Sequence, residues 1–415
     1  MRATVPAAVE APAEKGTQAS ATDPAFQGPR AAGRYPGRVR AALLGLILAV
    51  AACARPHAPG RGLPTSITYV VEPPAAGSWT LRVEERIERA ASPRLVAPEL
   101  DADPPALVLV ATGEARLLRR AGGAWLAPSC AERCTLRYQV DLQALASACR
   151  GFECPRRVGD ALLGTAARWM VRPDVLDDAT IHITAGGDHV ARFATGLRRD
   201  GDGGYTLHGR ELREASYTAI GGFRRAHVEF PGAALDVVFL GPPLQMGDEA
   251  VLAWIRRAAG CVASLYGRFP ADATVFVVPV PRADRVVFGR VLSLAGASVL
   301  LLFGYQTPAD AVGSDWVVVH ELSHLGPPSF VGQGHWLEEG LATYYEPILR
   351  ERSGWMRPED LWGHFVREMP RGLRKRGEPP SLEERDEIDS TYWGGALFAP
   401  LASVRRSIEG GGAPH

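Results

Sequence analysis

His320-Glu321-Leu322-Ser323-His324 is followed along the chain by Trp336-Leu337-Glu338-Glu339-Gly340-Leu341-Ala342. Residues four positions apart lie on one face of an α-helix, so His320 and His324 can direct both imidazole rings at one metal ion. Glu321 then lies beside the open coordination position. Catalytic zinc takes three protein ligands and keeps a fourth position for water, so one more ligand must come from a second segment. Together the two segments predict a zinc site.

The residues around the first segment predict a short, buried helix. The apolar run Trp316-Val317-Val318-Val319 precedes the histidines, with Ser314 or Asp315 as the expected N-cap, and Gly326-Pro327-Pro328 is typical of a helix end. Two solvated histidines on a surface helix are the alternative interpretation of the same motif. Burial of two histidines and a glutamate without a ligand is energetically costly, which favours the metal site.

HELSH followed by WLEEGLATYYE resembles the gluzincin metallopeptidases, a peptidase MA-like group, of the aminopeptidase-N and glycyl-aminopeptidase type. The glutamate before the glycine of the second helix is the third zinc ligand in that family. The resemblance therefore implies Zn²⁺ bound by His320, His324 and Glu339. Glu338 is the competitor on sequence alone, but it would point about 100° away around the helix. His335 is a further alternative ligand, and a solvated loop histidine is its other interpretation.

A second part of the resemblance lies at Tyr392-Trp393-Gly394-Gly395-Ala396-Leu397, which is similar to the family's Y-x-K-G-A-L helix. It implies that Tyr392 donates a hydrogen bond to the oxyanion, while a core tyrosine at a helix start is the alternative. The implied mechanism is hydrolysis by a zinc-activated water, with Glu321 as the general base that passes the proton to the leaving amine. Helical spacing also places Thr343 and Glu346 where they could reach the histidines, although Glu346 could equally be solvated.

The substrate-binding strand departs from the family pattern. Aminopeptidase N carries a Gly-Ala-Met-Glu-Asn strand whose glutamate captures the substrate's amino terminus, and the corresponding segment here is taken as Gly296-Ala297-Ser298-Val299-Leu300-Leu301. An edge strand there could still hold an extended peptide by main-chain hydrogen bonds, without an amine-binding carboxylate. We therefore expect a zinc metallopeptidase with a peptide or protein substrate, and exo or endo action stays open. A non-peptidase zinc hydrolase and a non-catalytic envelope binding lipoprotein are the alternatives.

The N-terminal residues predict export and a lipid anchor. Arginines precede Ala41–Ala52, an apolar run too short to span a bilayer as a helix. Val50-Ala51-Ala52-Cys53 resembles a bacterial lipobox, which implies membrane attachment through a lipid on Cys53. A small-residue signal-peptidase site is the alternative. The predicted location is therefore the cell envelope, at the outer membrane or the periplasmic face.

Composition and hydrophobic pattern predict an α+β fold in two domains. We expect an extension and signal peptide over 1–52, a tether over 53–65, a β-rich domain over 66–242 and a thermolysin-like gluzincin domain over 243–415, with a small mixed sheet and the zinc helices. The predicted strands of the β-rich domain include Leu107–Val110, Ile181–Thr184 and Leu235–Leu240. The 46 basic and 46 acidic residues balance, so nothing indicates a nucleic-acid partner. The chain ends soon after Tyr392, so a truncated C-terminus is one interpretation.

Four of the six cysteines form a cluster: Cys130, Cys134, Cys149 and Cys154. In an exported protein such a cluster predicts two disulfides, with three possible connectivities. A structural zinc site is the rival interpretation, and its spacing is not that of a zinc ribbon. Cys261 lies beside the apolar stripe of a predicted helix that begins near Asp248, so we expect it to be a small buried apolar side chain.

Overall fold

A computed structural model describes residues 65–111, 114–148, 154–327, 333–385 and 387–401, all of which belong to one compact unit. The predicted signal peptide, the lipobox with Cys53 and the tether up to Pro64 lie outside the described residues. Among the described helices, none has the length and hydropathy needed to cross a membrane.

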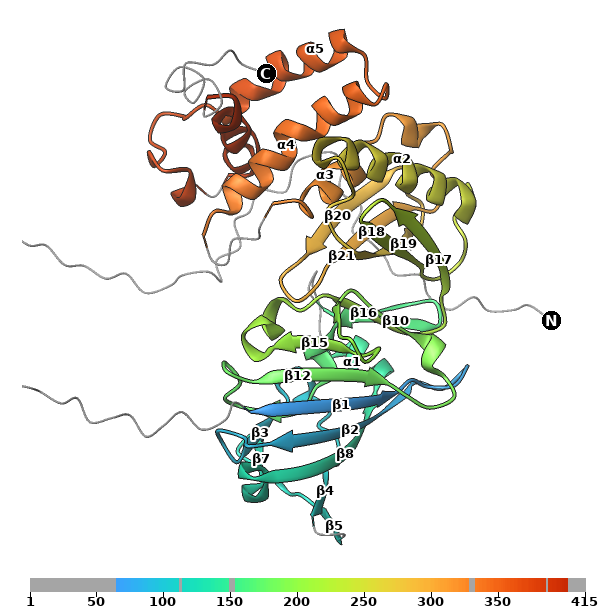
Figure 1. Ribbon diagram of the computed structural model, residues 1–415, viewed down its shortest axis with the longest axis vertical. Coiled ribbons are helices and arrows are strands. Elements are labelled where there is room, and N and C mark those ends of the chain that lie inside the picture. The colour runs from blue at the N-terminus through green and yellow to red at the C-terminus, as the bar shows by residue number, and fades with distance from the viewer. Residues whose placement is uncertain (1–64, 112–113, 149–153, 328–332, 386, 402–415) are drawn as a thin grey trace, which may run out of the picture. The chain divides into compact units, whose positions relative to one another are not determined.

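The first part of the chain is built on an eight-stranded sheet (Figure 1). All neighbouring strands are antiparallel except β1 and β12, which are parallel. Leu81, Val83 and Ile87 are buried on one face of β2, as the alternating pattern requires. In spatial order the strands are β14 (Arg198–Arg199), β15 (Tyr205–His208), β12 (Thr180–Ala185), β1 (Ser66–Glu72), β2 (Thr80–Glu88), β8 (Arg133–Asp141), β4 (Val108–Ala111) and β5 (Glu114–Leu117).

Two four-stranded sheets and a short helix, α1 (Leu142–Ser147), complete this part. The Asp141 carboxylate caps α1 by accepting hydrogen bonds from the backbone N–H groups of Gln143 and Ala144. One sheet consists of β13 (Phe193–Thr195), β16 (Tyr217–Gly221), β10 (Ala161–Thr165) and β9 (Arg156–Val158), and the other of β11 (Arg172–Pro173), β3 (Arg94–Val96), β7 (Ala124–Leu126) and β6 (Arg120–Ala121). Single 3₁₀ turns of this part lie at Pro98–Leu100, Pro128–Ala131, Ala166–Trp169, Val190–Arg192 and Gly209–Glu214.

The second part is a mixed five-stranded sheet covered by helices. In spatial order its strands are β17 (Arg224–Phe230), β18 (Ala233–Phe239), β19 (Ala273–Val280), β21 (Ser298–Gly304) and β20 (Val286–Leu292). The helices are α2 (Asp248–Tyr266), α3 (Val317–Ser323), α4 (His335–Arg352), α5 (Pro358–Glu368) and a π-helical turn at Ser390–Gly394, with 3₁₀ turns at Ala311–Gly313, Met369–Gly372 and Leu382–Glu384. Gly267 ends α2 in the left-handed conformation, with φ of 72°.

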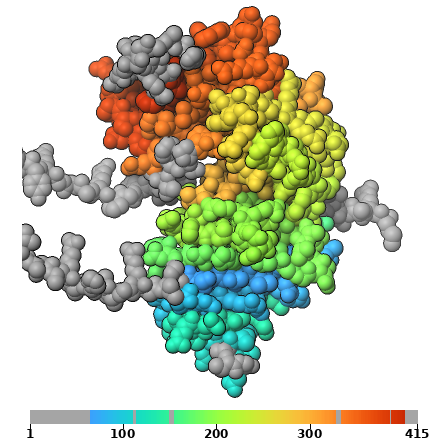
Figure 2. All heavy atoms as spheres, in the orientation of Figure 1, coloured from blue at the N-terminus to red at the C-terminus, as the bar shows by residue number. Residues whose placement is uncertain are grey.

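The five-stranded sheet is apolar on both faces because different elements cover them. Leu235 and Val275 pack with α2 and α3 on one face, whereas Phe276 and Leu300 pack against β10 and β16 of the first part. Figure 2 shows the light-green atoms of the first part directly against the yellow atoms of the second. The sheet begins at Arg224, before the boundary expected at residue 243, so the predicted strand Leu235–Leu240 belongs to the second part and not to the β-rich domain.

One disulfide joins Cys130 and Cys134. This pair excludes the two connectivities in which Cys130 bonds to Cys149 or Cys154. Cys154 is also disulfide-bonded, and Cys149 lies outside the described residues. Cys261 is a free, buried thiol in α2, as predicted from its place beside the apolar stripe.

A carboxyl group is buried in the core of the first part. Glu85 on β2 is fully buried, and its Oε1 lies 3.2 Å from the Tyr69 hydroxyl oxygen, which itself lies 2.7 Å from the Val171 carbonyl oxygen. The Tyr69 hydroxyl has only one hydrogen to donate. It can donate that hydrogen to the Val171 carbonyl oxygen when Glu85 is protonated and itself donates a hydrogen bond to the Tyr69 oxygen. Burial raises the pKa of Glu85 well above its usual range, and Tyr69 and Arg172 offset this only in part.

The folded state raises the pKa of Glu85. The contribution of Glu85 to the free energy of unfolding is therefore complete below its unfolded-state pKa of about 4.3, and it is lost as pH rises. We expect Glu85→Gln to match the parent at pH 4 and to exceed its free energy of unfolding at pH 8. The advantage should grow by about 1.4 kcal/mol per pH unit until the folded-state pKa is reached. Denaturant unfolding at both pH values measures it, with the exposed Glu114→Gln as a control that should change neither value. An unchanged pH dependence in Glu85→Gln would refute the assignment.

Candidate metal centre

The helix that carries the first motif is buried along its whole length. All seven residues of α3 are buried, including His320 and Glu321. The helix begins at Val317, whose backbone N–H donates to the Asp315 carboxylate at 2.9 Å. The expectation that Ser314 or Asp315 is the N-cap is wrong, because Trp316 occupies that position. The Asp315 carboxylate accepts the N–H of the first helical residue from one position before the N-cap. His324 follows as the last residue of the same turn, so both histidines face α4.

The second motif lies on α4, and two glycines allow the π-helical turn to pack closely against this helix. A Cβ atom on Gly340 would lie 2.3 Å from the backbone carbon of Gly395, and a Cβ on Gly395 would lie 2.7 Å from the Cα of Gly340. Real Cβ atoms do not approach backbone this closely, so only glycine at both positions permits the contact. The contact holds the π-helical turn with Tyr392 against the ligand-bearing part of α4.

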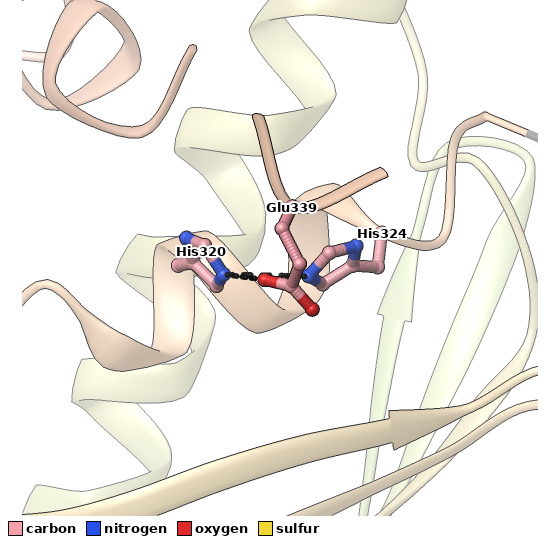
Figure 3. Close-up of side chains that lie close together, drawn as sticks. All are labelled: His320, His324 and Glu339. Atoms are coloured by element: carbon pink, nitrogen blue, oxygen red, sulfur yellow. Dashed lines mark hydrogen bonds and ion pairs between the residues drawn. The ribbon is translucent and has the colours of Figure 1, made fainter. Parts of the chain in front are cut away.

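Three side chains from these two helices converge on one point (Figure 3). The Glu339 Oε2 atom lies 3.1 Å from Nε2 of His320 and 3.6 Å from Nε2 of His324. The two Nε2 atoms are 3.3 Å apart, and the three ligand atoms all lie within 4.8 Å of one another. The structure thus brings together the three residues that the sequence indicated. His335 is outside the cluster, with a largely exposed side chain 3.9 Å from the other oxygen of Glu339.

The spacing of the three ligand atoms fits a tetrahedral zinc ion. Two ligands held about 2.0–2.1 Å from zinc at a tetrahedral angle lie about 3.3 Å apart. The separations of 3.1, 3.3 and 3.6 Å match this value, and the donor set of two imidazoles and a carboxylate is one that catalytic zinc uses.

The electrostatics of the cluster favour an ionised Glu339. Burial opposes the charge, but hydrogen bonds with His320 and His324 outweigh it and hold the pKa of Glu339 far below its usual range. Burial lowers the pKa of His320. For His324 burial acts in the same direction, yet the hydrogen bond and charge of Glu339 raise its pKa. A charged carboxylate and a neutral imidazole are the forms that bind a metal.

Glu321 lies beside the triad and against a strand. Burial raises the pKa of Glu321 to about 8, with a further rise from Glu339 and opposing effects from His324 and Arg290. A Cβ atom on Gly289 of β20 would lie 2.4 Å from Cγ of Glu321, so the glycine leaves the space that the glutamate occupies. A buried carboxyl group whose pKa lies near neutrality is typical of a general acid or base.

Tyr392 packs against the ring of His320. Its ring stacks on the His320 ring with a centroid distance of 5.6 Å and an interplanar angle of 7°. Burial and the negative charge of Glu339 raise the pKa of Tyr392 well above its usual range, and its hydroxyl hydrogen-bonds with that carboxylate. The phenol therefore keeps its proton and can act as a hydrogen-bond donor.

Glu346 has a different role from the two that the sequence suggested. It is buried and pairs with Arg350 at 2.9 Å, and Arg350 also donates to the Ser314 carbonyl oxygen at 2.9 Å. Burial raises the pKa of Glu346 to about 7, although Arg350 opposes the rise. The hydroxyl of Thr343 is buried without a hydrogen-bond partner among the described residues. The Glu346–Arg350 pair thus ties α4 to the residues that precede α3, instead of orienting a histidine.

The segment expected to form a substrate-binding edge strand lies inside the sheet, so that prediction is wrong. Ser298–Gly304 forms β21, which lies between β19 and β20 and has no open edge. β20, the neighbour of β21, is an edge strand of the sheet, and Glu321 packs against it. Chain order alone does not reveal that β20, although earlier in sequence, lies outside β21 in the sheet.

Two solved structures are similar to this chain. An aminopeptidase N family protein from Idiomarina loihiensis is 14% identical, covers 83% of this chain and 68% of its own length, and has a TM-score of 0.58. An M1 zinc metallopeptidase from Deinococcus radiodurans is 17% identical over 83% of this chain and 82% of its own, with a TM-score of 0.40. No protein-family model and no curated protein matches the sequence. The first similarity confirms the expected gluzincin-type α+β fold, in which a β-rich part precedes the part with the zinc helices.

The geometry predicts one zinc ion per chain. We expect His324→Ala to lower zinc affinity by at least about 100-fold, because it removes a direct ligand, whereas losing a supporting contact alone costs 10–100-fold. Competition with a chelating dye measures the affinity. His335→Ala is the matched control and should bind zinc like the parent, since that side chain lies outside the cluster. Equal affinity in His324→Ala and the parent would contradict the site.

Proposed function

We propose that the protein is a zinc metallopeptidase that hydrolyses peptide bonds. The convergence of His320, His324 and Glu339 is the single observation that carries the proposal. The fold shared with an aminopeptidase N family protein supports it. Zinc, when bound, supplies Lewis acidity and lowers the pKa of a bound water to about 7.

Glu321 and Tyr392 supply the proton transfer and the hydrogen bond that the reaction also needs. Glu321 accepts a proton from the attacking water and delivers it to the leaving amine, a role that suits a buried carboxyl group with a pKa near neutrality. Gly289 supports this role by leaving Glu321 room beside β20. Tyr392 donates its hydroxyl hydrogen to the oxygen on which negative charge develops, because its raised pKa keeps it protonated.

The proposal has a direct test with two variants and one control. We expect Glu321→Gln to lower kcat by about 10²–10⁴-fold, and Tyr392→Phe by about 10²–10³-fold, with zinc content unchanged in both. Peptide-library cleavage followed by mass spectrometry measures activity, and metal analysis measures zinc. Tyr345→Phe removes a phenol hydroxyl from α4 outside the triad and should cleave like the parent. Equal cleavage by zinc-loaded Glu321→Gln and the parent would sink the mechanism.

We further propose that the protein works as a cell-envelope lipoprotein anchored through Cys53. The apolar run Ala41–Ala52 followed by Cys53 supports the proposal. Radiolabelled fatty acid should be incorporated into the parent and not into Cys53→Ser when both are expressed in a bacterial host. Label in both proteins, or in neither, would rule out lipidation of Cys53, and fractionation would then show whether a cleaved, unanchored form is exported.

A further inference from the structure

Two arginines on edge strands face the apolar layer between the two parts of the chain. Arg290 on β20 pairs with Leu300 across the five-stranded sheet, and Arg156 on β9 pairs with Leu163 in the sheet of the first part. Both leucines are buried in the layer between these sheets. Paired residues of neighbouring strands share a face of their sheet. The two arginine side chains therefore approach one layer from opposite sides.

Arg290 directly follows the glycine against which the proposed general base packs. A Cβ atom on Gly289 would lie 2.6 Å from Oε1 of Glu321, so the carboxyl group lies against this point of the strand. Burial lowers the pKa of Arg290, and the negative charge of Glu321 opposes this effect. Arg290 in turn opposes the rise in the pKa of Glu321. The guanidinium group is therefore within electrostatic reach of the group proposed to move the proton.

A buried phenol in the same layer carries a hydroxyl without a hydrogen-bond partner among the described residues. It belongs to Tyr217 on β16, which is 5% exposed and packs edge-on against Phe276. Burial raises the pKa of Tyr217 to about 12, with an opposing effect from Arg156 and a further rise from Glu321. The phenol thus keeps its hydrogen as a donor. A buried donor of this kind is favourable only when a ligand or water supplies the acceptor.

These three groups combine positive charge with hydrogen-bond donors. Each guanidinium carries five N–H donors, so Arg156 and Arg290 can bind a substrate group in addition to their contacts within the protein. The planar donors of a guanidinium match the two oxygens of a carboxylate, and the Tyr217 hydroxyl can donate to the same group. An ammonium group at this place would meet like charge. The chemistry of the layer therefore suits an anion.

We propose that Arg290, Arg156 and Tyr217 form a subsite that binds a substrate carboxylate next to the cleaved bond, so that the protein prefers anionic peptides. The position follows from the strand, because Arg290 adjoins the residue against which Glu321 packs. An acidic side chain and the free carboxyl terminus of a short peptide are the two sources of such a carboxylate. This inference rests on the proposed peptidase function and names its substrate class.

Peptides that differ in one residue test the preference. Amidated octapeptides, with a free or an acetylated amino terminus, carry Glu, Gln or Lys at each of the two positions that flank the cleaved bond. Mass spectrometry measures kcat/KM with the zinc-loaded parent. We expect Glu to exceed Gln by about 30-fold at one of the positions, the effect of one buried charge pair. Tripeptides with a free or an amidated carboxyl terminus test the second source in the same way.

Variants on two strands assign the preference to the subsite. In Arg290→Gln the ratio of kcat/KM for Glu over Gln should fall to about one, in Arg290→Lys part of it should return, and in Arg290→Glu the Lys peptide should become the better substrate. Arg156→Gln should lower the ratio at least about threefold. Arg157→Gln is the matched control, because Arg157 is exposed on the other face of β9 and donates to the Gly159 carbonyl oxygen. It should keep the ratio of the parent.

Equal kcat/KM for Glu and Gln at both positions, together with equal cleavage of free and amidated tripeptides, would overturn the inference. So would an equal loss for all peptides in Arg290→Gln, since Arg290 would then act only through Glu321. Denaturant unfolding identifies a variant that does not fold, and Tyr217→Phe and Arg156→Gln then supply the comparison.

A failure of the peptidase function gives a different result. In that case the zinc-loaded parent cleaves none of the peptides. Titration calorimetry of the Glu and Gln peptides into the parent and Arg290→Gln then decides the inference by itself. Tighter binding of the Glu peptide that is lost in Arg290→Gln would support the subsite, and equal Kd values for the two peptides in the parent would overturn it.

Discussion

The burial of two imidazoles and a carboxylate around one point is the constraint on which the rest of the structure depends. Polar groups removed from water need partners, and here the partners lie on two separate helices. α3 must be buried to carry His320 and His324, and α4 must approach it closely enough for Glu339 to reach both. The five-stranded sheet supports α2 and α3 on one face, and its strand β20 lies beside Glu321. The sheet thus holds α3 in the position in which α4 packs against it.

A second buried ionic group sets the distance between the same helices. Arg350 joins Glu346 on its own helix to the Ser314 carbonyl oxygen, just before α3 begins. Asp315 lies in the same region and accepts a hydrogen bond from the Val317 backbone N–H at the start of α3, and burial raises its pKa to about 6. A buried arginine with two hydrogen-bonded partners is directional, because its planar donors accept only one arrangement of acceptors. The pair therefore fixes geometry at the metal centre without touching a ligand.

Sequence reasoning recovered the parts of the site that depend on local spacing. The helical interval of His320 and His324, the glycine that selects Glu339 and the tyrosine of the later turn all lie where local pattern and family resemblance placed them. It failed where the answer depends on spatial order. β20 lies outside β21, and β17 and β18 join the second sheet, and both results follow from packing between segments that are distant in sequence. Glu346 pairs with Arg350 four residues later on its own helix, and Arg350 in turn reaches the Ser314 carbonyl oxygen, which is distant in sequence. A cleft beside His324 carries no sequence signal, because its lining comes from six separate segments.

The contact between Gly340 and Gly395 has a consequence for how such a chain can lose activity in evolution. Any side chain at either position would force the turn of Tyr392 and α4 apart, although neither glycine is itself a member of the metal-binding triad. A lineage could thus pass, by one substitution, to a pseudoenzyme that retains its ion and its architecture. Homologues with an intact ligand set but a bulkier residue at either glycine are therefore the ones in which a purely recognition-based role should be sought.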